Sequence, residues 1–307
     1  MDVDSARRRE KPGQPRGDEE QRMTLKDILL HLDATPRCAA RVGVAAGLAA
    51  RHGAHLTGLF VIDLPPPDMF YGFPSAFIDL QRAEDIVERL RAAATAAAAV
   101  AEAAFRDRLR RDGLQGEWRL VEGNTGETVA LHGRYVDLVV VGQTDPRASA
   151  AERAAQPAAT MLMAGGRPLL MVPFAGNFPV VGQDVLIGWN ASAEAARAVN
   201  DALPILQQAR KVTVLSINAR HGIAGDGDLP SADIALHLAR HGVRAEAAQT
   251  VATDISDGDA LLSYAADIGA DLLVTGMYGH SRLREMVFGG VTRSLLTEMT
   301  VPVFMAH

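Results

Sequence analysis

The sequence contains one cysteine, few aromatic residues and no long apolar run, and these shortages narrow what the chain can be. Cys38 alone cannot form an intramolecular disulfide, which fits a reducing compartment, and its alanine-rich surroundings predict a buried small apolar side chain. A membrane-spanning helix needs roughly 18 or more apolar residues. The Ala92–Ala104 run is only weakly apolar and contains Thr95 and Glu102, so it predicts an ordinary helix. We expect a cytoplasmic protein with no membrane partner.

The chain also lacks the basic excess of nucleic-acid-binding proteins. Its formal net charge is −6 and its pI is about 5.9, which argues against broad binding to nucleic acid or anionic membranes. Residues 1–23 mix both charges without an apolar stretch, so they predict a disordered tail and no secretory signal. The Arg7–Arg9 run in this tail is expected to be solvated, although an interaction patch is the alternative.

The remaining chain carries one alternating pattern of strands and helices twice. With 307 residues, of which 48% are hydrophobic, it suits two domains of about 150 residues each. We predict domains at 24–174 and 182–307, joined by a linker at 175–181. Apolar strands alternate with helices in both, which predicts an α/β fold with a doubly wound parallel sheet in each half. Thr35 and Pro36 are expected to open the first helix as N-cap and first residue.

The length of this repeat is given by the spacing between equivalent positions in the two halves. Asp33 and Asn190 end the first strands and lie 157 residues apart. The spacing is 134 residues for two later pairs, Asp137 with Asp271 and Pro168 with Pro302. The first half is therefore 23 residues longer, as the difference of 157 and 134 shows. A period of this length indicates two homologous domains rather than a solenoid.

Two segments hold the extra length of the first half. One is a long helix predicted from Arg82 to Asp112, with Gly113 as its stop. The other is residues 63–80, where three consecutive prolines exclude a regular helix or central strand and the aromatic residues gather at Met69–Phe77. This second segment could be a lid, a dimer contact or a packed surface loop. We favour packing or self-association, because an exposed patch of this kind would be a liability.

A glycine-pinned loop near the end of the chain predicts an anion site. The apolar stretch 271–275 leads into Gly276 and Gly279, and Gly289 comes ten residues further on, before a helical stretch at 292–298. Glycines let backbone N–H groups approach a phosphate, and the helix N-terminus adds unpaired donors and a positive dipole end. We therefore expect the phosphates of a nucleotide to bind here.

The repeat and the loop together resemble the universal stress protein family, specifically its tandem two-domain members. The resemblance covers residues 24–307, and its most specific element is the glycine motif, in which Gly276, Gly279 and Gly289 keep the family's spacing and Val291-Thr292 continue it. It implies five-stranded parallel sheets of order 3-2-1-4-5 with helices on both faces. It also implies ATP, with Mg²⁺ as an optional companion, bound where the first and fourth strands diverge.

The resemblance implies a set of nucleotide-binding positions in the second half: Asn190, Gly276, Gly279, His280, Gly289, Gly290, Val291 and Thr292. Two of them depart from the family. Gly290 replaces a Ser or Thr, which removes a hydroxyl donor but keeps a backbone N–H. Asn190 replaces an Asp that contacts adenine, and an amide can still accept from the adenine amino group. Tyr278 stands at the position of the family's loop histidine.

The first half keeps Asp33 but not the loop. Subtracting 134 from the motif positions gives Gly142, Asp145, Ala155, Gln156 and Ala158. Asp145 would set a carboxylate beside the phosphates, and Pro157 would remove a backbone donor. We predict that this half does not bind ATP and serves as a structural partner of the second half, with the two halves meeting through their final strands, Leu169–Val172 and Val301–Met305.

The sequence offers few candidates for metal binding or catalysis. His237 and His241 lie four residues apart and could share a metal on one helix face, but a solvated helix end is the better interpretation. His31 is expected to be a satisfied core or rim histidine. No P-loop, early Gly-x-Gly-x-x-Gly or nucleophile elbow is present.

We therefore predict an ATP-binding regulatory or stress-response module with no catalytic residues and at most slow ATP hydrolysis. The first alternative is an interaction or scaffold protein of the same fold that binds no nucleotide. The second is an adenylating enzyme, which would need catalytic residues that we do not find. The expected partners are an adenine nucleotide, the other half in an intramolecular pseudo-dimer, and a second copy in a homodimer that Met69–Phe77 could mediate.

Overall fold

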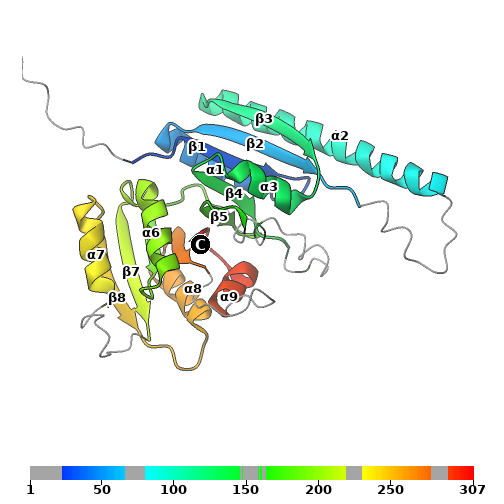
Figure 1. Cartoon of the computed structure of the whole chain (residues 1–307). Coiled ribbons are helices and arrows are strands. Elements are labelled where there is room, and N and C mark those ends of the chain that lie inside the picture. The colour runs from blue at the N-terminus through cyan, green and yellow to red at the C-terminus, as the bar shows by residue number, and fades with distance from the viewer. Residues whose placement is uncertain are drawn as a thin grey trace, which may run out of the picture.

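The computed structural model describes residues 23–65, 80–145, 164–218, 230–277 and 290–307, with residues 147, 158 and 160 in addition (Figure 1). The first half contains β1 (Asp27–Leu32), α1 (Cys38–His52), β2 (His55–Ile62), α2 (Leu80–Asp112), β3 (Gly116–Glu122), α3 (Thr125–Gly133), β4 (Leu138–Gly142) and β5 (Leu169–Val172). The second half contains β6 (Asp184–Gly188), α6 (Ala193–Leu206), β7 (Lys211–Ile217), α7 (Pro230–Arg240), β8 (Ala245–Thr250), α8 (Asp257–Asp267), β9 (Leu272–Gly276), α9 (Gly290–Glu298) and β10 (Val303–Ala306). The tail predicted at 1–23 and the Met69–Phe77 segment lie, but for Met23, outside the described residues.

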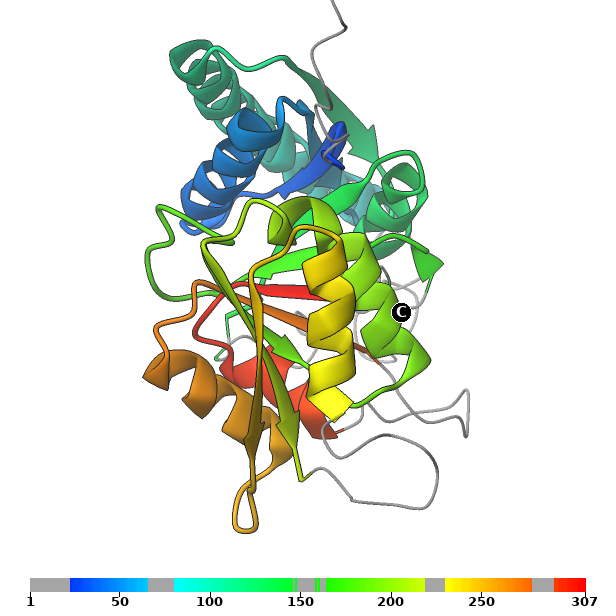
Figure 2. The same cartoon turned by 90° about the vertical axis from the view of Figure 1, so that its left-hand side faces the viewer.

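The strands run in the order β3-β2-β1-β4-β5-β10-β9-β6-β7-β8. The predicted α/β class and the order 3-2-1-4-5 are confirmed, since β3-β2-β1-β4-β5 has this order and β8-β7-β6-β9-β10 repeats it. The two predicted sheets are joined into one. Strands β5 and β10 pair antiparallel, with Phe304 opposite Leu170 and Val303 opposite Met171, so ten strands form a single mixed sheet (Figures 1 and 2).

The sheet is covered on both faces, which explains why its central strands are continuously apolar. Strands β5 and β10, with the sequences LLMV and VFMA, are buried at every position. One buried cluster lies under α1, α2, α6 and α7 and runs through both halves. The other lies under α3, α8 and α9. In Figure 2, α6 and α7 stand on one side of the strands, with α8 and α9 on the other.

The predicted start of the first helix is wrong by two residues. Helix α1 begins at Cys38, and its N-cap position, Arg37, makes no side-chain capping bond. The Thr35 hydroxyl does not cap the helix, because it donates to Asp33 Oδ1 at 2.6 Å while the Thr35 N–H donates to the same oxygen at 2.9 Å. Residues 35–37 instead form a turn that brings the chain from β1 into α1.

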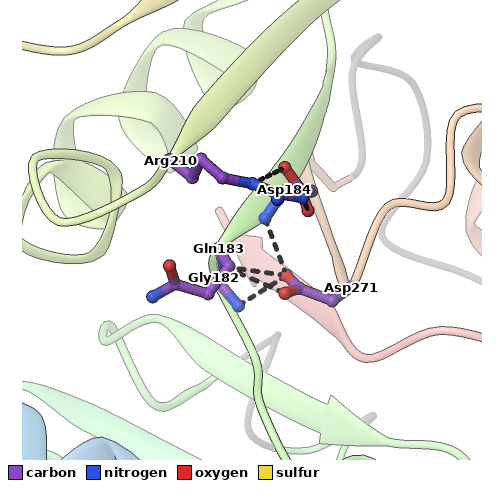
Figure 3. Close-up of polar contacts among 5 residues, drawn as sticks. All are labelled: Gly182, Gln183, Asp184, Arg210 and Asp271. Carbon is purple, nitrogen blue, oxygen red and sulfur yellow. Dashed lines mark hydrogen bonds and ion pairs between the residues drawn. The ribbon is translucent and has the colours of Figure 1, made fainter.

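Two equivalent aspartates tie the start of the first strand to the start of the fourth in each half. In the second half, Asp271 accepts backbone N–H groups from Gly182, Gln183 and Asp184 at 2.7 to 3.3 Å (Figure 3). In the first half, Asp137 accepts from Lys26 at 2.7 Å and Asp27 at 3.1 Å. The repeat therefore preserves a structural acceptor as well as the strand pattern.

Helix α2 extends over residues Leu80–Asp112, close to the predicted span. Its inward side chains, Phe105 among them, pack on the first half of the sheet, and Phe105 lies 6.1 Å from Trp118 between ring centroids. Within the described part of the chain, neither α2 nor any other helix is long and apolar enough to span a bilayer.

Candidate functional site

The candidate site lies where the carboxyl ends of β6 and β9 meet. These strands are parallel neighbours, with Gly188 of β6 opposite Thr275 of β9. The chain leaves β6 toward β7 on one side and leaves β9 toward β10 on the other. Parallel sheets bind ligands at this kind of divergence. The register brings the sequence-predicted residues Asn190 and Gly276 to the same end of the sheet, because each follows its strand's paired region by one or two residues.

Asn190 occupies an exposed turn between β6 and α6. Its side-chain Oδ1 accepts the Ser192 N–H at 3.1 Å, and Ala191 adopts the left-handed backbone conformation, with φ of 58°. Ser192 then caps α6 by accepting the Ala195 N–H at 3.1 Å. Asp33 in the first half makes the same contact to the residue two positions later, so this turn holds a polar side chain at the end of the first strand in both halves.

Gly276 is required by close backbone packing. A Cβ at this position would lie 2.3 Å from the Ala195 nitrogen and 2.4 Å from the Glu194 carbonyl carbon, far inside van der Waals contact. The first turn of α6 can therefore approach the end of β9 only because residue 276 has no side chain. From the sequence motif we predicted that this glycine contacts phosphate. The structure shows that it also allows β9 and α6 to pack closely.

Helix α9 begins at Gly290 on the far side of the loop. Val291 is half-buried, and Thr292 is buried with its hydroxyl donating to the Met277 sulfur at 3.5 Å. The start of α8 supports this region, since a Cβ on Gly258 would lie 2.8 Å from Ser294 Cβ. Gly279, His280 and Gly289, like Tyr278, lie outside the described residues, so their predicted phosphate contacts stay predictions.

The sequence reasoning did not identify two polar residues at the start of α8. Ser256 caps α8 and lies 3.4 Å from the Ser294 hydroxyl of α9. Asn218, at the end of β7 with φ of 52°, accepts the Ala252 N–H at 3.0 Å and donates to Asp257 at 3.2 Å. A signal was available for Ser256, because a serine three residues before an acidic residue is typical of a helix start. No local pattern indicated Asn218.

An ion pair occupies the equivalent place in the first half. Arg41 of α1 is buried, and its Nη2 lies 2.5 Å from Asp33 Oδ1. A Cβ on Gly142, the counterpart of Gly276, would meet Arg41 Nη1 at 2.1 Å. The guanidinium therefore fills the space at the end of β4. This half has an internal cation where the second half has only the backbone of α6.

The charge of Arg41 lowers the pKa values of two neighbouring groups, Asp33 and His31. Burial raises the pKa of Asp33, but attraction to Arg41 and hydrogen bonds from Arg41 and Thr35 outweigh it, so that pKa is lowered. His31, on β1, is buried as expected, yet its Nδ1 has no hydrogen-bond partner within the described part of the chain, so the prediction of a satisfied histidine is wrong. Burial, followed by repulsion from Arg41, lowers the pKa of His31 to about 4.

The degenerate loop of the first half is described only at its ends. Gly142 ends β4, and Asp145 accepts the Arg147 N–H at 2.8 Å, which lowers the pKa of this carboxyl. Ala158 is buried. Ala155, Gln156 and Pro157 lie outside the described residues.

The histidine pair of α7 packs closely. The ring centroids of His237 and His241 are 4.7 Å apart. Across the residues that the structure describes, no group of three or more His, Cys, Asp or Glu side chains could hold a metal ion.

Comparison with known proteins gives a family match for the second half. Residues 183–307 match the model of the universal stress protein family. No curated protein matches the chain. A solved universal stress protein from Archaeoglobus fulgidus DSM 4304 is 15% identical and has a TM-score of 0.66, with 91% of this chain and 95% of that chain covered. A putative universal stress protein from Pseudomonas aeruginosa UCBPP-PA14 is 14% identical and has a TM-score of 0.53, with 92% and 93% covered. At these identities the likeness shows a shared two-domain fold.

Proposed function

We propose that the chain, whose residues 183–307 match the model of the universal stress protein family, is a regulatory, stress-response module that binds an adenine nucleotide in its second half. The ligand we expect is ATP, alone or with Mg²⁺, and the compartment is the cytoplasm, in keeping with the single cysteine. The first half acts as a structural partner. The domain boundaries, 24–174 and 182–307, belong to this proposal.

One observation supports the assignment of the two halves more than any other. At the carboxyl ends of the first and fourth strands, the first half holds the Asp33–Arg41 ion pair, with buried Arg41 against Gly142, and the second half holds exposed Asn190 at the same end of the sheet as Gly276. In the first half the Arg41 guanidinium, already paired with Asp33, takes up the space at the end of β4. In the second half the turn is exposed, and the start of α9 faces the same end of the sheet.

The first experiment asks what the purified protein carries. The protein is denatured, the supernatant is chromatographed for adenine nucleotide, and nucleotide-free protein is titrated with ATP by calorimetry, with and without Mg²⁺. We expect saturable binding at millimolar concentration or below, with one site per chain. Absence of carried nucleotide together with no saturable binding would reject the proposal.

A matched pair of variants locates the site. Gly289→Asp places a side chain and a negative charge at the predicted phosphate position, so we expect it to abolish ATP binding. Ala155→Asp introduces the same group at the equivalent position of the first half and should leave binding unchanged. The opposite pattern would place the nucleotide in the first half.

The second candidate function is an interaction or scaffold protein that binds no nucleotide in either half. It is favoured by the Asn190 Oδ1 contact to the Ser192 N–H, which already uses one of the two polar groups expected to read adenine. ATP turnover, if present, should be slow, because we can name no catalytic base. Turnover that disappears in Gly289→Asp would instead support an adenylating enzyme.

A further inference from the structure

Helix α2 is longer than the sheet it covers. Its 33 residues span about 50 Å at 1.5 Å per residue, whereas the 8 residues of β2 beneath it span about 26 Å. Its last polar contact with the sheet toward the N-terminus is the ion pair of Arg91 with Glu122 of β3. Figure 1 shows α2, in cyan, running well past the strands. Several turns of this helix therefore project beyond the strands that α2 covers.

The projecting turns carry large apolar side chains in water. Ile86 is 40% exposed and Leu90 is 44% exposed, and they lie one turn apart. Short helices in water are marginal without packing. A projecting helix with two exposed aliphatic residues on one side is typical of a surface that packs against another helix.

A complementary groove lies further along the same helix. A cavity of about 510 Å³ opens between α1 and α2. Small apolar side chains form much of its walls, from Ala39 and Val42 of α1 and from Ala97, Val100, Ala101 and Ala104 of α2. The turn after β1, with Asp33 and Thr35, closes one end, and Arg108 and Arg111 of α2 also line it. Val100 is 73% exposed at its mouth.

The exposed residues and the groove share one face of α2. Ile86, Leu90, Ala93, Ala97, Val100 and Ala104 follow one another at spacings of four and three residues, which is the seven-residue repeat of helices that pair along a seam. This face lies about 100° around the helix from Ala98 and Phe105, which are buried against the sheet. One face of α2 thus packs on the sheet, while the adjacent face, apart from half-buried Ala97, is exposed over the described residues.

We propose that this face binds a second copy of the chain, with the two α2 helices antiparallel across a two-fold axis. In this arrangement Ile86 lies against the partner's Ala104, Leu90 against the partner's Val100, and Ala93 against the partner's Ala97. Each large side chain then meets a smaller one, and the projecting end of each helix fills the groove of the other. The interface is isologous, so it closes at two copies.

Charge favours the antiparallel direction. The described projecting residues 84–90 include Glu84, Asp85 and Glu88 against a single arginine, Arg89. Residues 102–112 contain four arginines against Glu102, Asp107 and Asp112, so this stretch has a net charge of +1, although its arginines also pair with these carboxylates along the helix. The antiparallel arrangement places the acidic end of each helix beside the basic end of the other, and the parallel arrangement would place like charges together.

The association state of the full chain tests the proposal. Sedimentation equilibrium should show a monomer–dimer equilibrium, and Leu90→Glu should weaken it by about 30-fold or more, because a charge would be buried in the seam. Leu236→Glu is the control, since Leu236 is a leucine with 53% exposure on α7, away from this face. Circular dichroism checks that both variants fold. A monomer at all concentrations, or equal effects of the two variants, would overturn the proposal.

Cross-linking tests the direction of the helices. In a Cys38→Ser background, the double variant Leu90→Cys with Val100→Cys should give a covalent dimer on mild oxidation. Leu90→Cys alone should not, because antiparallel helices hold these two positions 10 residues, or about 15 Å, apart along the seam, and a disulfide needs Cα atoms within about 7 Å. A cross-link in the single variant would contradict the antiparallel arrangement, and no cross-link in either would contradict the seam.

Discussion

At the scale of single residues, two glycines of this fold differ in whether a side chain could be accommodated at their positions. Gly276 lies against the backbone of Glu194 and Ala195, with 2.3 Å between a built Cβ and the Ala195 nitrogen. Gly47, in the middle of α1, has no atom within 4 Å of its own built Cβ. The two positions therefore give a matched pair, in which the same substitution meets backbone in one case and open space in the other.

We expect Gly276→Ala to destabilise the protein by about 1–3 kcal/mol, because either α6 or the end of β9 must move. Gly47→Ala should be neutral or stabilising by up to about 1 kcal/mol, because alanine is the better helix former. Urea unfolding of both variants measures the difference. Equal effects would mean that α6 does not pack on Gly276 as closely as described.

Buried histidines make the fold sensitive to acid. His52 is buried at the end of α1, with its Nδ1 3.1 Å from Gln208 Nε2 of the second half. Burial, and then repulsion from Arg51, lowers the pKa of His52 to about 4. The unfolded chain, with a histidine pKa near the ordinary value of 6.5, therefore binds the proton more readily than the folded protein does.

The sign of the pH dependence follows. The contribution of neutral His52 is fully present above pH 6.5 and is lost as the pH falls from 6.5 toward 4. His31 acts in the same direction. Both histidines therefore contribute to the loss of stability in acid. We expect His52→Gln to flatten the dependence of the free energy of unfolding on pH between 4 and 6.5, measured by urea titration. An unchanged slope would show that His52 is not buried in its neutral form.

At the scale of elements, sequence periodicity located the strands and helices but not the contacts between them. Runs such as Leu138–Gly142 are apolar at nearly every position because both faces of the sheet are covered, and this signal is local. The start of α1 was misplaced because Asp33, a residue outside the helix, takes the Thr35 hydroxyl. Asp137 and Asp271 were interpreted as first residues of strands. Their roles as acceptors depend on chain segments 87 to 111 residues away.

The Asp271 acceptor gives the sharpest prediction at this scale. Burial raises the pKa of Asp271, although hydrogen bonds from Gln183, Gly182 and Asp184 oppose the rise. Asp271→Ala leaves these N–H groups without their acceptor, so we expect a loss of about 1–3 kcal/mol in the free energy of unfolding. Asp267→Ala is the control, since Asp267 is exposed in the last turn of α8, where a negative charge is unfavourable. A control variant as unstable as Asp271→Ala would count against this role.

At the scale of the whole molecule, the candidate site was only partly accessible to sequence reasoning. The motif spacing identified the strand and helix that frame the loop, and the repeat arithmetic identified the degenerate half. Neither indicated that Arg41 would fill the first half's position, because that depends on where a side chain of α1 points in the folded protein. The resemblance predicted that the two halves meet through their final strands, as β5 and β10 do, but two separate sheets were expected rather than one sheet of ten strands.

A single sheet predicts that the two halves unfold together. Besides the β5–β10 pairing, the buried Gln143 side chain donates to the Leu296 carbonyl at 3.1 Å and accepts the Phe174 N–H at 2.9 Å. Scanning calorimetry should therefore show one transition whose calorimetric and van't Hoff enthalpies agree. Two separate transitions would mean that the halves are stable without this junction.

The β5–β10 junction also determines which strand edges meet water. The outermost strands of the sheet are β3 and β8. Strand β3 carries Glu117 and Arg119, and β8 carries Glu246. Charged side chains on outer strands discourage pairing with other chains. Cutting the chain at its linker would uncover β5 and β10, whose side chains are all apolar. Either half expressed alone should therefore aggregate, or form a dimer through its exposed β5 or β10. In the full chain, each half covers the apolar edge strand of the other.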